Sequence, residues 1–158
     1  MDVLTIQNLK KSFDSKEVLC GLDMSVSEHS IFGFIGKNGA RKTTTMKVIL
    51  GLLKVDSGAI YVMGEKVHFG QTNTNRHIGY LPDVPEFYSY MTPHEYLTLC
   101  GEVCGMGKAG IVTRSKELLE LVGLGQERHR IKGFSRGMKT TLGNCTGTFK
   151  PPKTFNLR

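Results

Sequence analysis

The sequence predicts an α/β fold, and two observations support this prediction. Short apolar runs rich in Ile, Val, Phe and Leu, such as residues 31–35, have the composition of strands and are separated by glycine-containing turns. Segments with helix start signals follow them, above all in the second half of the chain. Strands that alternate with helices are typical of α/β domains.

The loop between the apolar run at 31–35 and a helix expected from Thr45 to Leu50 organises the fold. It consists of Gly36, Lys37, Asn38, Gly39, Ala40, Arg41, Lys42, Thr43 and Thr44. A glycine-containing loop that joins a strand to a helix and ends in Lys-Thr is typical of a phosphate-binding P-loop. Its backbone N–H groups and the positive end of the helix attract phosphate oxygens. Lys42 adds a full charge near the β- and γ-phosphates, and the Thr43 hydroxyl suits Mg²⁺.

Arg41 departs from this pattern, because the motif has glycine immediately before the lysine. A side chain at this position places a Cβ where the backbone must approach phosphate closely. If the position also requires a positive φ, the substitution costs roughly 1–2 kcal/mol. The sequence therefore predicts a phosphate site with weakened binding.

Composition bounds the remaining possibilities. The 158 residues are 39% hydrophobic and 22% charged, which is typical of one soluble globular domain. No apolar run approaches the roughly 18 residues of a membrane span, and the first residues lack the pattern of a signal peptide. The four cysteines form no metal-binding pattern and are interpreted as reduced thiols. The net charge of +7 is dispersed rather than grouped, so we expect no nucleic-acid partner.

Strands are expected at residues 3–6, 18–26 and 59–62, where apolar positions recur between turn residues. Phe13 lies between the first two of these strands. It is either an ordinary core residue or an exposed platform on which an adenine ring stacks. We include Phe13 among the candidate binding residues.

The second half of the chain contains one further strand and three helix starts. Proline ends the strand at 77–82, and Asp83 follows where ligands commonly bind. Thr92 begins a helix that reaches about residue 105, since Pro93 and Glu95 complete the start signal. A second helix is expected at 111–122, and a third begins at Ser135, two residues before Gly137.

Taken together, these residues resemble the ATP-binding subunit of ABC transporters over residues 1–139. Phe13 occupies the adenine-stacking position, and Gly36 to Thr44 resembles the Walker A motif. Asp83 stands where the family usually has the Gln of its Q-loop, and the sequence around Ser135 and Gly137 resembles the signature motif, with Arg136 for its first Gly. The sequence of the Q-loop and of the helix after it is most similar to that of subunits of the bacitracin and lantibiotic export type.

The resemblance implies a P-loop NTPase core with an N-terminal antiparallel β region and a helical subdomain at about 92–135. It implies ATP and Mg²⁺ as cofactors, with Thr43 and Asp83 as metal ligands and Ser135 and Gly137 at the nucleotide. A second ATP-binding subunit and a transporter membrane subunit are the implied partners, with the helices between Thr92 and Val122 facing the membrane subunit. The implied location is cytoplasmic, peripheral on the inner face of the cell membrane.

After Lys139 the resemblance ends, and residues 140–158 are expected to be a disordered tail. The Walker B Asp and the catalytic Glu of the family do not occur in the sequence, so the domain is C-terminally incomplete. One extra base after the Lys139 codon would account for the tail, because codons can be chosen for residues 140–158 such that its removal yields QRLGIAQALLNHPKLLILD, which resembles the family's sequence. We therefore expect a shifted reading frame from residue 140.

Three functions remain open at this point. The chain is an incomplete copy of a transporter ATPase subunit, a non-hydrolysing remnant that acts only as a binding module, or a soluble ABC protein acting on ribosomes or DNA. The third class usually carries an inserted arm or a second cassette, for which 158 residues leave no room. Arg41 and the missing Glu distinguish the first two.

Overall fold

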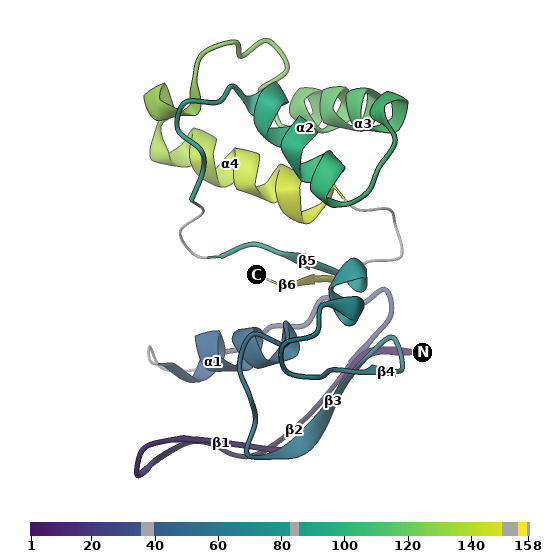
Figure 1. Ribbon diagram of the computed structural model, residues 1–158, viewed down its shortest axis with the longest axis vertical. Helices are drawn as coiled ribbons and strands as arrows, with labels where there is room; N and C mark the ends of the chain where they lie inside the picture. The colour runs from purple at the N-terminus through teal and green to yellow at the C-terminus, as the bar shows by residue number, and fades with distance from the viewer. Residues whose placement is uncertain (36–39, 83–85, 150–154, 158) are drawn as a thin grey trace. The chain divides into compact units, whose positions relative to one another are not determined.

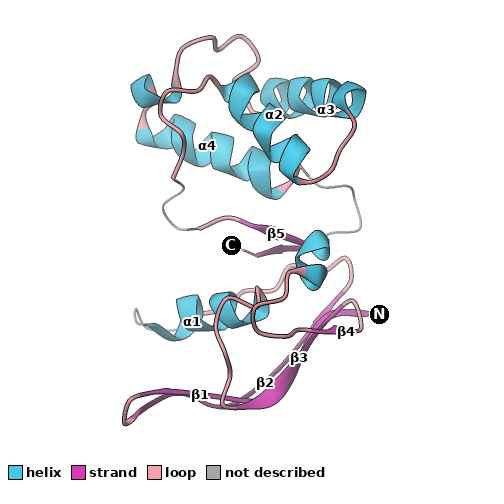
Figure 2. Ribbon diagram, viewed as in Figure 1, coloured by secondary structure: helices cyan, strands magenta, loops and turns pink. Residues whose placement is uncertain are grey.

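The computed structural model describes residues 1–35, 40–82, 86–149 and 155–157 (Figure 1). The chain divides into two compact units, Met1–His77 and Ile78–Arg158. The first contains an antiparallel sheet and a helix, and the second contains three helices and a pair of short strands (Figure 2). The expected α/β class with an N-terminal antiparallel β region and a helical part is confirmed.

Four strands form the sheet of the first unit, in the order β2-β1-β3-β4. Their bounds are β1 Asp2–Phe13, β2 Lys16–Ser27, β3 Ser57–Val62 and β4 Glu65–Lys66. β1 is antiparallel to both β2 and β3, and Phe13 pairs with Lys16 across a two-residue turn. The three predicted strands are thus confirmed, and the first is longer than the 3–6 expected.

Helix α1, Ala40–Ile49, packs against β2 and begins earlier than the expected Thr45. Val48 and Ile49 at its end are buried, as are Leu4 and Ile6 of β1. Between β4 and the second unit, a short 3-10 helix covers Asn73–His77. The core of this unit therefore positions the start of α1.

The buried strand predicted at 31–35 is wrong in this structure. These residues have no regular secondary structure, and the side chains of Ile31 and Ile35 are 103% and 95% exposed. A strand requires a neighbour for its backbone hydrogen bonds, and none of the described strands pairs with this segment. An apolar composition alone did not determine its state.

Three helices build the second unit: α2 Pro93–Val103, α3 Lys108–Leu121 and α4 Arg136–Gly147. A short 3-10 helix, Ile131–Gly133, precedes α4. Strand β5, Ile78–Tyr80, pairs in parallel with β6, Phe155–Leu157. The three predicted helix starts agree with the structure to within a few residues.

The start of α2 is a complete capping box. The backbone N–H of Glu95 donates to the Thr92 hydroxyl at 3.3 Å, and the N–H of Thr92 donates to the Glu95 carboxylate at 2.8 Å. Both bonds satisfy N–H groups that a helix start leaves unpaired. Pro93, with no N–H of its own, is the first helical residue.

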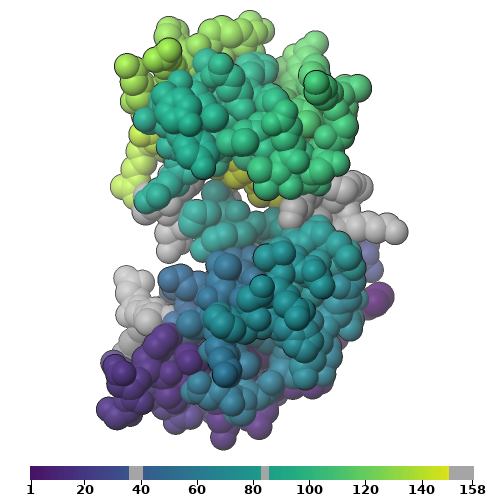
Figure 3. Space-filling model, in the orientation of Figure 1, coloured from purple at the N-terminus to yellow at the C-terminus, as the bar shows by residue number. Residues whose placement is uncertain are grey.

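One apolar core holds the three helices together, with Leu97, Ile111, Leu119, Ile131 and Leu142 at most 2% exposed. Figure 3 shows α2 and α3, in teal to green, in contact across the visible face of this unit. None of the helices in the described part of the chain is long and apolar enough to cross a membrane.

The structure also differs from the expectation of a disordered tail after Lys139. Helix α4 continues through residue 139 to Gly147, and Leu142, Cys145 and Phe149 are buried in the helical core. Leu142 and Cys145, three residues apart, lie on one face of α4, and Phe149 joins the same core just after the helix ends. The expectation rested on the end of the resemblance and overlooked this spacing.

Candidate functional site

The first turn of α1 forms the described part of the predicted phosphate loop. Gly36, Lys37, Asn38, Gly39 and Asp83 lie outside the described residues. Lys42 is partly exposed and Thr43 is exposed, whereas Thr44 and Thr45 are only 5% and 1% exposed. The Thr45 hydroxyl donates to the carbonyl of Arg41 at 2.8 Å. Two buried threonines therefore anchor the helix start, and the predicted ligand side chains face outward.

The electrostatics of this helix start favour an anion. The first turn contains no acidic residue, and it carries the charges of Arg41 and Lys42. The positive end of the helix dipole adds to these charges, and the backbone N–H groups of a first turn have no partner within the helix. Phosphate oxygens are negatively charged and accept hydrogen bonds, so they complement the positive charge and the unpaired N–H groups of this helix start.

The backbone strain considered for Arg41 does not occur in the structure. The described non-glycine residues with a positive φ are Asn8, Asp14, His29 and Met63. Arg41 is instead the second residue of α1 and has an exposed side chain. A helical residue has a negative φ, so arginine incurs no left-handed penalty here. Only the bulk and the charge of Arg41 remain to affect a phosphate ligand.

Phe13 lies at the exposed tip of the β1–β2 hairpin and is 41% exposed, so it is not an ordinary core residue. The Lys11 Nζ lies 5.2 Å from the centre of its ring and also 3.1 Å from Asp56 Oδ1. The backbone N–H of Ser12 donates to the other Asp56 oxygen and holds the pKa of that carboxyl below its usual 3.8. The ring is thus held from one side and accessible, as adenine stacking requires.

Ser135 and Gly137 begin α4 in the second unit, and both are exposed. The Ser135 hydroxyl oxygen accepts from the backbone N–H of Met138 at 3.2 Å, so Ser135 is the N-cap. A Cβ added to Gly137 would meet only the Ser135 Oγ, at 3.8 Å. This is a second helix start with an accessible hydroxyl and little steric cover.

The metal ligands expected from the sequence are only partly described. Thr43 presents an exposed hydroxyl at the start of α1. Within the described ranges, no group of three or more His, Cys, Asp or Glu side chains could hold a metal ion. Mg²⁺ commonly takes one or two protein ligands and completes its shell with phosphate oxygens and water. A single hydroxyl beside a helix start that favours an anion is compatible with that chemistry.

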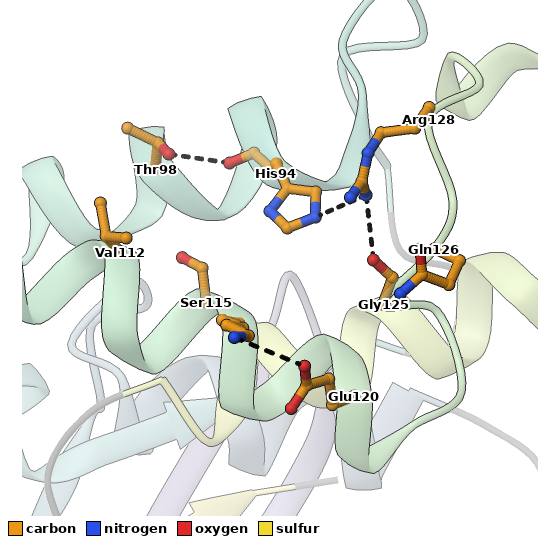
Figure 4. Close-up of a pocket in the computed structure, with 9 residues that line it drawn as sticks. His94, Thr98, Val112, Ser115, Glu120, Gly125, Gln126 and Arg128 are labelled. Atoms are coloured by element: carbon orange, nitrogen blue, oxygen red, sulfur yellow. Dashed lines mark hydrogen bonds and ion pairs between the residues drawn. The ribbon is translucent and has the colours of Figure 1, made fainter.

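Sequence reasoning missed a cavity between α2 and α3, lined in part by His94, Ser115 and Arg128 (Figure 4). The available signal was a serine on the apolar stripe of α3, between Ile111 and Leu118, where a buried polar group needs a partner.

Comparison with known proteins agrees with a nucleotide-binding chain. The ABC transporter family pattern matches residues 19–155, beyond the limit of 139 expected from the motifs. The chain is 40% identical over 156 residues to the uncharacterized ABC transporter ATP-binding protein YxlF of Bacillus subtilis (strain 168), and 37% identical to the bacitracin transport ATP-binding protein BcrA of Bacillus licheniformis. Both alignments include 98% of this chain, but they include only 51% and 50% of the two relatives, so the chain spans about half of their length.

Two further comparisons agree. The lantibiotic transport ATP-binding protein SrtF of Streptococcus pyogenes is 32% identical, with 65% of its length covered. A solved structure described as the ATP-binding subunit of an ABC transporter superimposes with a TM-score of 0.84 at 28% identity. That match covers 93% of this chain and 62% of the other.

Proposed function

Because the chain belongs to the ABC transporter family of ATP-binding domains, we propose that it derives from the ATP-binding subunit of an exporter of peptides or drugs. The start of α1 carries this proposal, since it combines a positive helix end with Lys42 and an exposed Thr43. The names of the bacitracin and lantibiotic relatives support the substrate class.

In this proposal, the chain binds ATP and Mg²⁺. Lys42 binds the β- and γ-phosphates, Thr43 and Asp83 bind the Mg²⁺, and the ring of Phe13 stacks on adenine. Ser135 and Gly137 of α4 bind the nucleotide of a second ATP-binding subunit. A membrane subunit holds the pair at the cytoplasmic face of the cell membrane through the helices between Thr92 and Val122.

We propose further that the chain binds nucleotide weakly and does not hydrolyse it. Turnover in P-loop ATPases requires a group that orients the attacking water and a Walker B carboxylate at the metal. The sequence contains neither motif after α4. This part of the proposal concerns residues 1–158 alone, which span about half the length of the YxlF and BcrA relatives.

Titrations with Mg·ATP test this proposal on the full chain and on three variants. Arg41→Gly removes both bulk and charge, Arg41→Ala keeps the Cβ without the charge, and Lys42→Ala removes the phosphate ligand. We expect about tenfold tighter binding for Arg41→Gly, no gain for Arg41→Ala, and loss of binding for Lys42→Ala. Unchanged affinity in Lys42→Ala, or phosphate release by any of these chains, would contradict the proposal.

A shifted reading frame from residue 140 explains why the tail still packs. With codons chosen to give the family-like sequence, the positions of Leu142, Cys145 and Phe149 encode Leu, Ala and Leu in the restored frame, so all three buried positions are apolar in both frames. A leucine codon that begins with TT places T second in the shifted codon, and all codons with a second T encode apolar residues. Sequencing the gene tests this. Deleting one base after the Lys139 codon should open a frame with the Walker B Asp-Glu, and no such frame would refute the shift.

A further inference from the structure

The cavity between α2, α3 and the loop that follows α3 has a volume of about 250 Å³ (Figure 4). His94 and Thr98 line it from α2, Val112 and Ser115 from α3, and Arg128 from the loop. This volume is smaller than the roughly 300–1,000 Å³ of a typical site for drug-sized ligands. It suits one side chain or a small organic ion.

Ser115 supplies an unpaired hydroxyl to this cavity. The residue is 3% exposed, and its Oγ has no hydrogen-bond partner among the described residues. Two residues earlier on α3, the Thr113 hydroxyl donates to the Ala109 carbonyl at 3.1 Å, but Ser115 makes no such bond. Figure 4 shows its oxygen directed from α3 toward α2. A buried hydroxyl without a hydrogen-bond partner is destabilising, so a ligand that accepts a hydrogen bond from it would be favoured.

His94 supplies a second donor. Its Nε2 lies 3.1 Å from Arg128 Nη1. A guanidinium only donates, so Nε2 accepts and the ring proton is on Nδ1. Figure 4 shows this other nitrogen on the side of the ring that faces Ser115. Arg128 is held in place by a second bond, 2.9 Å to the Gly125 carbonyl.

The charges around the cavity indicate an anionic ligand. Arg128 lies beside His94 (Figure 4), and Lys116 is a further basic residue that lines the cavity. Glu120 is the acidic residue among the lining residues, and its carboxylate is 4.0 Å from Lys116 Nζ, which offsets its charge. Val112 provides an apolar wall.

We propose that this cavity binds a carboxylate on a short apolar stem, the side chain of a glutamate from a partner polypeptide. The hydroxyl of Ser115 and the Nδ1–H of His94 donate to the carboxylate, and Arg128 supplies the opposite charge. Val112 contacts the stem. The proposal concerns the helical unit alone and does not depend on nucleotide binding.

Calorimetric titration of the full chain with N-acetyl-glutamate N-methylamide, its glutamine analogue and butyrate tests this. We expect saturable binding of the glutamate compound and at least tenfold weaker binding of the glutamine analogue. Ser115→Ala should weaken glutamate binding about tenfold, while its thermal midpoint without ligand is unchanged or higher, because an unpaired buried hydroxyl has been removed. Ser89→Ala, at an exposed serine of the same unit, should bind as the unchanged chain does.

Equal binding of the glutamate and glutamine compounds, no binding of either, or full affinity in Ser115→Ala would overturn the proposal. Binding of butyrate without the glutamate compound would overturn the polypeptide source and assign the cavity to a free small carboxylate.

Discussion

Replacement of Phe149 by alanine distinguishes a packed α4 region from a disordered tail. Phe149 is 1% exposed, and its Cε1 lies 3.0 Å from the position that a Cβ on Gly101 would occupy. Gly101 has no side chain that could fill the space left by the ring. Phe→Ala substitutions in such cores cost about 3–5 kcal/mol, and a void that cannot collapse favours the upper half of that range.

Urea unfolding followed by far-UV circular dichroism measures this loss, since three of the four described α-helices belong to the second unit. With a slope of about 1–3 kcal/mol per molar urea, the midpoint should fall by at least about 1 M. Leu121→Ala is the control within the same unit, because Leu121 is 81% exposed, and surface substitutions stay within about 0.5 kcal/mol. An effect of Phe149→Ala no larger than that of the control would refute the packing of the tail.

Two further predictions concern titratable groups in the helical unit. Burial raises the pKa of the Cys145 thiol to about 11, so Cys145 should react with a disulfide reagent only on unfolding, whereas the exposed Cys104 reacts at once. Equal rates for the two thiols would contradict the packing of α4. The Thr92 backbone N–H and hydroxyl donate to the Glu95 carboxylate and hold its pKa below the usual 4.5. The resulting stabilisation is complete above about pH 4.5 and is lost as the pH falls through the lowered pKa, so Glu95→Gln should flatten the acid decline of the thermal midpoint. A Glu95 pKa at or above 4.5 in an NMR titration would argue against this bond.

The sequence by itself determined the features that depend on neighbouring residues. The Thr92–Glu95 capping box, the Ser135 N-cap and the hairpin that presents Phe13 each involve groups within a few positions of one another. Such contacts form whenever the local backbone does, so residue type and spacing predict them. The Lys42-Thr43 pair at a helix start is of the same kind.

Only the tertiary structure decided the features that depend on distant partners. The apolar run at 31–35 lacks a paired neighbour in the described chain, although its composition favours a strand. Phe149 is buried because Gly101, 48 positions earlier, leaves room for its ring. The cavity at Ser115 exists because α2, α3 and the loop at Arg128 meet around it. Burial is a property of the whole packed unit, and a local pattern supplies only one side of each such contact.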